Sequence, residues 1–185
     1  DYLYHNIGDS VALYTQDGKV LKQDEVLSYP CVGEDHPGLR YFRSVRTTGR
    51  NESTVVALFS AKLLNTGTSY MKMWMPASSD VSYFTALAPS AKTASSPYQS
   101  KPSLVVTMRK EKPAVEEPFV VVYEPISDKL STGLIESVDR IKLDSLGKKG
   151  CAIKVKTKEG DTFTLVNILK DGPVILNNQK CCGDF

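Results

Sequence analysis

The sequence predicts an all-β protein: a large antiparallel β-sandwich, supersandwich-like, with little or no helix. Apolar and polar residues alternate with a period of two in several segments, as in strands that bury one face. Turn-forming pairs such as Asp17 and Gly18 separate these segments at nearly regular intervals. No stretch of ten residues or more has the apolar spacing of an amphipathic helix. The 185 residues suit a single sandwich domain over residues 1–185.

The first half of the chain is expected to form six strands joined by polar turns. Residues 54–64 are the longest apolar run, and the turn at 65–67 favours a hairpin with residues 70–75. Residues 23–28 have a composition that would allow one or two helical turns. The expected strands cover residues 2–5, 11–15, 41–47, 54–64, 70–75 and 80–87.

Residues 70–76 contain the only tryptophan of the chain and three of its four methionines. With a period of two, the methionines share one face, and Tyr70, Lys72 and Trp74 share the other. Both faces carry large apolar surface, which predicts a strand in the middle of a sandwich. The methionines are expected in the core. Trp74 and Tyr70 are expected either in a second packing surface or in a surface on which sugar rings stack.

The second half is expected to add five strands after a surface loop at residues 88–102. Residues 119–123 are continuously apolar and lie between prolines, which predicts a buried central strand. In the last hairpin, Ile153 and Val155 are expected to face the core while the lysines between and after them face water. Phe163 and Leu165 are expected to face the same core. The expected strands cover residues 103–109, 119–123, 134–143, 152–157 and 162–168.

Composition and charge argue against several classes of function. The 23 basic and 21 acidic residues leave a net charge of +2, which gives no electrostatic argument for a nucleic-acid partner. No apolar run approaches the roughly 20 residues that span a bilayer, so no membrane span is expected. The chain begins at Asp1 in what already looks like a strand, without a signal peptide. We therefore expect a fragment of a larger protein with an important part upstream.

The cysteines form no recognisable metal-binding motif. No Cys-x-x-Cys pair and no His–Cys cluster indicates zinc, so no metal ligand and no cofactor is predicted. Cys181 and Cys182 are adjacent, a spacing that strains a direct bridge. One of them could pair with Cys31 or Cys151 in an oxidising compartment, or all four thiols could be free.

The first strand holds the candidates for a catalytic role. Tyr2 and Tyr4 share one of its faces, and His5 lies on the other. Tyrosine and histidine can serve as general acid and base near neutral pH when their pKa values are shifted. The partners that such chemistry needs are not evident, so a structural or substrate-lining role for this strand is the favoured alternative.

The candidates for substrate binding are aromatic residues elsewhere in the chain. Rings of this kind stack on sugars, and the residues in question are Tyr70, Trp74 and Tyr98.

Four stretches of the chain resemble the heparinase II/III-type polysaccharide lyases, in the β-sheet region that follows their helical domain. They are Asp-Tyr-Leu-Tyr-His-Asn-Ile-Gly-Asp (1–9), Met-Trp-Met-Pro-Ala-Ser (73–78), Ser-Leu-Val-Val-Thr-Met-Arg (103–109) and Pro-Phe-Val-Val-Val-Tyr-Glu-Pro (118–125). The resemblance implies a parent enzyme that cleaves acidic polysaccharides by β-elimination, with most catalytic residues on a helical toroid. It also implies that Tyr2, Tyr4 and His5 match a strand near the cleft. A structural metal of the parent would have its ligands mostly before Asp1.

Three hypotheses follow for the function. The first is a non-catalytic β-sandwich portion of such a lyase, periplasmic or secreted, which packs against the upstream helical domain and walls the cleft for a uronate-containing polysaccharide such as a glycosaminoglycan. The second is a free-standing carbohydrate-binding module, and the third is a structural or adhesion domain. The chain alone is expected to show no lyase activity.

Overall fold

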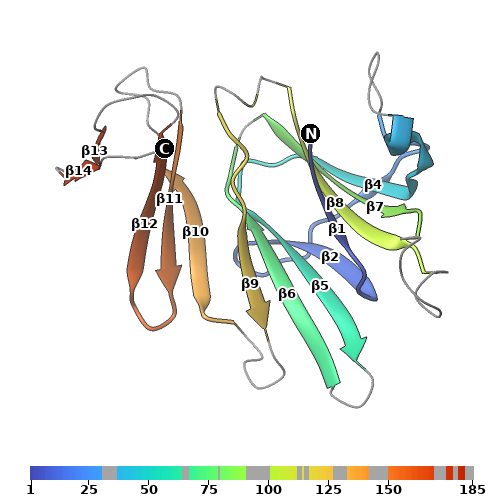
Figure 1. Ribbon diagram of the computed structural model, residues 1–185, viewed down its shortest axis with the longest axis horizontal. Helices are drawn as coiled ribbons and strands as arrows, with labels where there is room; N and C mark the ends of the chain where they lie inside the picture. The colour runs from blue at the N-terminus through green and yellow to red at the C-terminus, as the bar shows by residue number, and fades with distance from the viewer. Residues whose placement is uncertain are drawn as a thin grey trace.

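The computed structural model describes residues 1–30, 37–63, 67–78, 80–90, 101–111, 114, 117–126, 133–141, 150–168, 174–176 and 179–181. In these ranges the chain is built from antiparallel strands, with one short 3-10 helix, η1 (Pro37–Tyr41), and no α-helix. Figure 1 shows three main sheets, here named A, B and C from right to left. The prediction of an all-β antiparallel sandwich is confirmed. Within the same ranges, no helix is long and apolar enough to cross a membrane.

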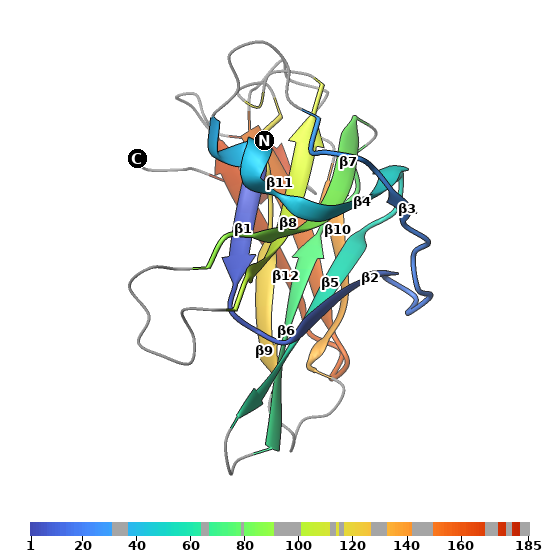
Figure 2. The same ribbon diagram turned by 90° about the vertical axis from the view of Figure 1, so that its right-hand side faces the viewer.

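Sheet A has five strands in the order β1-β8-β7-β4-β3. Figure 2 shows them in this order from left to right. Their bounds are β1 (Tyr2–Asn6), β3 (Asp24–Glu25), β4 (Arg43–Arg50), β7 (Val81–Ala88) and β8 (Ser103–Lys110). The helical turns expected at residues 23–28 are not formed, and that prediction is wrong. Asp24 instead pairs with Thr47 of β4, and the Val26 N–H donates to the Val45 carbonyl, so the sheet satisfies this backbone.

Sheet B has four strands in the order β2-β5-β6-β9. Their bounds are β2 (Ser10–Thr15), β5 (Val55–Leu63), β6 (Gly67–Met75) and β9 (Val122–Ile126). Strands β5 and β6 form the predicted hairpin, in which Val55 pairs with Met75. The prediction of a central strand at residues 119–123 is wrong, because the strand begins at Val122 and lies at the edge of the sheet. Pro125, which has no N–H to donate, is tolerated at this edge.

Sheet C has three strands in the order β10-β11-β12. They are β10 (Ile135–Ile141), β11 (Gly150–Thr157) and β12 (Thr162–Ile168). A separate small hairpin pairs β13 (Val174–Leu176) with β14 (Gln179–Cys181).

Sheet B is the middle layer and is apolar on both faces, as the alternation in β6 indicates. Met73 and Met75 point toward sheet A, where they are buried against Tyr83 and Val106. The pairing of Val55 with Met75 continues this inner face onto β5. One layer of the core therefore lies between sheets A and B.

The other face of sheet B packs on sheet C. Trp74 and Val56 lie against Val138, Ile153 and Val155 of the C strands. The sandwich thus has three layers, one more than two stacked sheets would give. Since both faces of β5 and β6 are apolar, sheet B needs a partner on each side.

Sheet C follows the predicted alternation only in part. Ile153 and Val155 are buried and Lys154 is exposed, as expected. Phe163 and Leu165 lie on the same face, because they pair with Val155 and Ile153, yet they are 53% and 55% exposed. Their expected burial is therefore wrong, because the cover that sheet B gives to this face ends at β11.

Candidate functional site: a tyrosine cluster at the edge of two sheets

The candidate site lies where β1 and β9, the edge strands of sheets A and B, come together. The hydroxyl oxygens of Tyr2 and Tyr123 are 2.6 Å apart and share a hydrogen bond. The rings of Tyr4 and Tyr123 lie 5.1 Å apart, tilted by 40°. Together these three side chains, here called the tyrosine cluster, close one edge of the A/B sandwich.

Strand register explains why the three rings meet. Tyr4 is paired with Val106 of β8 and Tyr123 with Met73 of β6, and both partners belong to the A/B core. Residues paired across an antiparallel ladder point to the same face, so Tyr2, Tyr4 and Tyr123 all start from the inner faces of their sheets. Because β1 and β9 are edge strands, the inner faces are only partly covered there, and Tyr123 remains 39% exposed.

Neighbouring side chains hold Tyr4 in place. Its ring meets Phe59 edge-on at 5.3 Å, and its hydroxyl donates to the sulfur of Met71 at 3.7 Å. The Asn6 amide donates to the same hydroxyl at 3.3 Å. The amide oxygen of Asn6 accepts the Gly8 N–H at 2.7 Å, which orients it. The cluster is therefore a fixed surface of rings and hydroxyls.

Electrostatics keep Tyr123 in its neutral form. Burial raises the pKa of Tyr123, and the hydrogen bond with Tyr2 raises it further. A phenol with a raised pKa donates and accepts hydrogen bonds at ordinary pH but does not act as a base. The cluster can therefore contact a polar ligand through hydroxyls and ring faces, with Tyr123 as a neutral hydrogen-bonding group.

The structure separates His5 from the tyrosines. His5 is exposed on the opposite face of β1, with its ring 6.3 Å from Phe42. Of the three predicted catalytic candidates, Tyr2 and Tyr4 are thus brought together and His5 is not. Tyr123 was missed, because its contact with Tyr2 spans 121 residues and no local pattern marks it.

The predicted stacking residues lie apart from this cluster. Trp74 is 3% exposed inside the B/C core, so its ring offers no face to a sugar. Tyr70, on the same strand, is 36% exposed. Tyr98 lies outside the described residues.

Trp74 is held by Glu124, a buried carboxylate that sequence reasoning also missed. Glu124 accepts the indole N–H of Trp74 at 3.0 Å and the backbone N–H of Ile135 at 2.8 Å. An acid inside the apolar run of residues 119–126 was a signal of a buried anchor. Glu124 thereby fastens the start of sheet C to sheet B.

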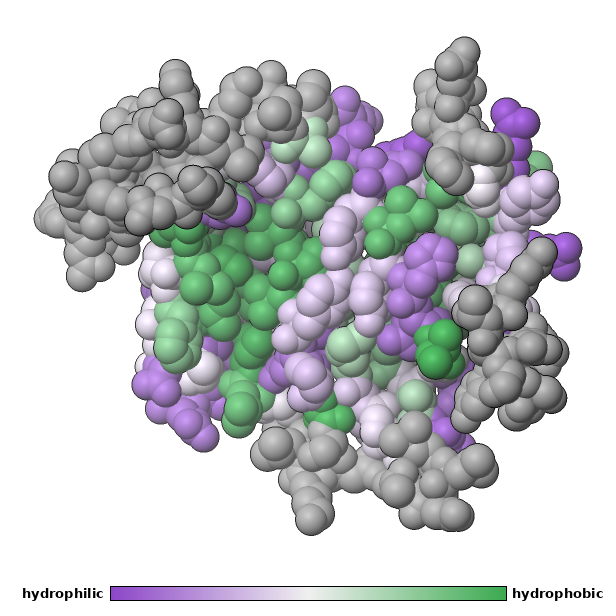
Figure 3. Space-filling model, viewed as in Figure 1, coloured by the Kyte–Doolittle hydropathy of each residue, from purple (hydrophilic) through white to green (hydrophobic). Residues whose placement is uncertain are grey.

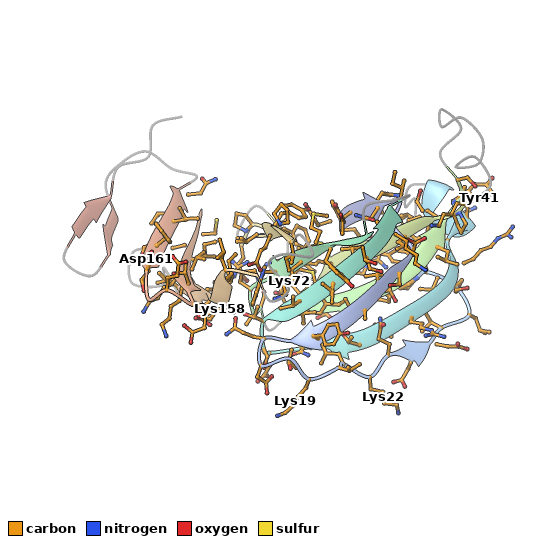
Figure 4. All side chains as sticks on the ribbon, turned by 90° about the horizontal axis from the view of Figure 1, so that it is seen from below. Lys19, Lys22, Tyr41, Lys72, Lys158 and Asp161 are labelled. Carbon is orange, nitrogen blue, oxygen red and sulfur yellow. The ribbon has the colours of Figure 1, made fainter. Side chains whose placement is uncertain are left out.

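Lysines complete the surroundings of this anchor. Lys72 pairs with Glu124 across β6 and β9, and its ammonium lies 5.4 Å from the Trp74 ring centre. Figure 4 labels Lys72, which lies on sheet B, and Lys158, which lies in the turn after β11. Burial lowers the pKa of Lys72, and the charge of Glu124 opposes that change. Lys158 donates to the Gly133 carbonyl at 2.9 Å.

A second buried polar group joins sheet A to sheet C. Lys110 of β8 lies 3.8 Å from Asp80 and 3.4 Å from Glu117. Arg140 of β10 contacts the other Glu117 oxygen at 3.0 Å, and the Ser78 hydroxyl donates to Asp80 at 2.7 Å. Two carboxylates balance two cations here, so we interpret this group as an ion-pair network that ties the layers together.

Within the part of the chain that the structure describes, no three His, Cys, Asp or Glu side chains gather as metal ligands would. Cys151 is a free thiol. The expected alternative of a bridge to Cys151 is therefore not formed. Cys31, Cys182 and the side chain of Cys181 lie outside the described residues, so a bridge to Cys31 stays a prediction.

Comparison with known proteins relates the chain to an enzyme of polysaccharide breakdown. It is 36% identical over 128 residues to an endo-acting ulvan lyase of Formosa agariphila. The match covers 68% of this chain and 15% of the lyase, so the chain spans about a seventh of that protein's length. No family model and no solved structure matches the chain. The chain is therefore related to a polysaccharide lyase.

Proposed function

We propose that this chain is the non-catalytic β-sandwich portion of a polysaccharide lyase that acts on an acidic, uronate-containing polysaccharide such as ulvan. The observation that carries the proposal is the 36% identity to an ulvan lyase over most of the chain. The resemblance of residues 1–9, 73–78, 103–109 and 118–125 to heparinase II/III-type lyases supports the finer assignment. On this proposal the protein is secreted or periplasmic and packs against a helical domain that precedes it.

The tyrosine cluster is the surface we assign to the polysaccharide. Tyr2, Tyr4 and Tyr123 offer hydroxyls and partly exposed ring faces along one edge, which suits the alternating polar rim and apolar face of a pyranose ring. β-Elimination also needs a base at the proton beside the uronate carboxyl group and an acid at the leaving oxygen. The raised pKa of Tyr123 disfavours it as the base. On this proposal the chain walls the cleft and the chemistry belongs to the helical domain.

Binding to ulvan tests the role of the cluster. Tyr123→Ala removes the central ring, and we expect it to weaken binding roughly tenfold or more, equal to about 1.4 kcal/mol. Tyr123→Phe keeps the ring and removes only the hydroxyl, so its effect should be smaller. Tyr41→Ala is the matched control, because Tyr41 is 67% exposed on η1, outside the cluster. Calorimetric titration with ulvan fragments measures all three, and equal affinities for Tyr123→Ala and Tyr41→Ala would refute the assignment.

Turnover separates a cleft wall from a free-standing binding module. The chain alone should release no unsaturated uronate from ulvan, heparin or alginate, and appearance of that product would overturn the proposal. In the longer polypeptide, Tyr123→Ala should raise the KM for ulvan. A module that binds without shaping the cleft would lose affinity in the same variant with no change in KM on short fragments.

A further inference from the structure

Sheet C carries two large apolar side chains in water on its outermost described strand. Phe163 and Leu165 of β12 are 53% and 55% exposed. They lie two residues apart, so they point to the same face and form one continuous surface, here called the apolar strip. Figure 3 shows hydrophobic residues gathered over the strands of sheet C on the side turned to the viewer.

The two faces of sheet C differ in polarity: one face carries exposed lysines and threonines, and the other carries mainly apolar side chains. On the face opposite the apolar strip, Lys154, Lys156, Thr162 and Thr164 are all exposed, and Lys156 pairs with Glu136 at 2.9 Å. Around these four residues that face is solvated, and it becomes buried only toward Ala152. On the face of the apolar strip, the residues of β11 and β12 are uncharged: Cys151, Ile153, Val155, Phe163, Leu165 and Asn167.

The apolar strip continues an interface that already exists. Leu165 pairs with Ile153, and Phe163 pairs with Val155, and both partners are buried under Trp74 and other residues of sheet B. The same face is thus covered along β11 and uncovered along β12. A layer that continued beyond sheet B would cover both strands.

We propose that the apolar strip is the docking surface for another domain of the same polypeptide. The proposal rests on the proposed function, since the related ulvan lyase has 85% of its length outside the matched stretch. The partner surface should itself be apolar, because Phe163 and Leu165 carry no charge and no hydrogen-bonding group. Phe163 and Leu165 lack the hydroxyls that the tyrosine cluster offers to a polysaccharide, which separates the strip from that cluster.

Amide hydrogen exchange compares the 185-residue chain with the longer polypeptide that contains it. We expect the amides of residues 162–168 to exchange roughly tenfold or more slowly in the longer polypeptide, because docking protects an edge strand from local opening. The double variant Phe163→Ser/Leu165→Ser should abolish this slowing. Thr162→Ser/Thr164→Ser changes the same strand on its solvated face and should preserve it. Equal exchange in the two wild-type proteins would overturn the proposal.

Two further measurements exclude other occupants of the apolar strip. The chain alone should sediment as a monomer. If the wild-type chain is a dimer and the double serine variant is a monomer, the strip is instead the contact with a second copy. The double serine variant of the chain alone should keep its urea midpoint, and a large drop would show that the chain's own residues cover the strip. Loss of ulvan binding in the tyrosine variants is independent of these results, so either proposal can fail while the other stands.

Discussion

Tyr83 shows how a single hydroxyl can set the response of this protein to pH. Its ring is fully buried in the A/B core, and its oxygen has no hydrogen-bond partner among the described residues. Burial raises the pKa of Tyr83, with the Arg140 charge opposing the rise and the Asp80 charge adding to it. The folded state therefore favours the neutral phenol more strongly than the unfolded state does.

The sign of the linkage gives a prediction for alkaline stability. Because the pKa is higher in the folded state, stability should be intact below pH of about 10, the value of a free tyrosine, and should fall as pH rises further. Tyr83→Phe should lessen this alkaline loss, and Tyr123 accounts for part of what remains. Urea midpoints measured between neutral and alkaline pH test this.

Tyr41→Phe is the control for the alkaline experiment, since Tyr41 is largely exposed. At neutral pH, Tyr83→Phe should cost less than about 1 kcal/mol, because it removes a buried group that lacks a partner. A steeper alkaline loss in Tyr83→Phe than in the wild type would contradict the explanation.

Sidedness within one strand could be predicted at this scale, but contacts across layers could not. Alternation placed Tyr2 and Tyr4 together and His5 opposite, as the structure has them. It gave no hint of the contacts of Tyr123 or Glu124. Tyr2, the partner of Tyr123, belongs to another sheet, and Trp74, the partner of Glu124, lies 50 residues away on a neighbouring strand. Periodicity predicts the face of the strand on which a side chain lies, but it does not predict which residues that side chain contacts.

The turn that leads into β10 depends on a glycine. Gly133 has a φ of +72°, and an added Cβ would lie 2.4 Å from a carboxylate oxygen of Glu124. Glu124 cannot easily move away, since the Trp74 indole and the Ile135 backbone N–H both donate to it. The turn and the anchor therefore require each other.

Substitution of two glycines with similar backbones separates strain from collision. Gly18 has a φ of +85° with open space around it, so Gly18→Ala should cost about 1 kcal/mol from backbone strain alone. Gly133→Ala should cost about 3 kcal/mol, because the collision also disturbs hydrogen bonds to a buried carboxylate. Urea unfolding followed by circular dichroism measures both. An equal decrease in the free energy of unfolding of the two variants would mean that the Glu124 side chain moves away from the added methyl group without cost.

The longer strands could be predicted, but the short strands β3, β13 and β14 could not, and neither could the position of a strand within its sheet. Residues 119–123 were expected to be central because they are apolar, whereas β9 lies at an edge and gains its cover from other layers. The predicted burial of Phe163 and Leu165 was wrong for a related reason: a side chain can point to the core face of its sheet where no other layer covers that face. Both errors come from treating apolar character as burial.

The three layers are joined by charge as well as by apolar packing. Lys110 on sheet A and Arg140 on sheet C meet at Glu117, and the Lys110 side chain is only 2% exposed. A buried cation of this kind stabilises the fold only while its anions are present, because desolvation costs nearly as much as pairing returns. Asp80 and Glu117 therefore hold Lys110 in place, and Lys110 holds them.

Removing the buried cation should cost far more than removing an exposed one. Lys110→Met should lower the free energy of unfolding by about 3–5 kcal/mol, because it leaves Asp80 buried with less compensation. Lys19→Met breaks the pair with Asp17, in which both side chains are more than half exposed, and should leave the unfolding midpoint nearly unchanged. Thermal unfolding of the two variants side by side checks this, and similar midpoints would argue against a network that couples the layers.

The sequence indicated that residues 70–75 pack on both faces, but it did not indicate which residues form the third layer. Large apolar residues on both faces of residues 70–75 indicated packing on two sides, and sheets A and C supply it. The second partner is the sheet of strands β10, β11 and β12. This follows from long-range packing, which alternation within one strand does not encode.

The position of Trp74 gives the protein a built-in optical probe. Trp74 is the sole indole of the chain, enclosed between sheets B and C. Its fluorescence should therefore shift to longer wavelengths when sheet C separates from sheet B, even while sheets A and B stay packed. Detachment of one layer can thus be followed in the unlabelled wild-type chain, apart from global unfolding.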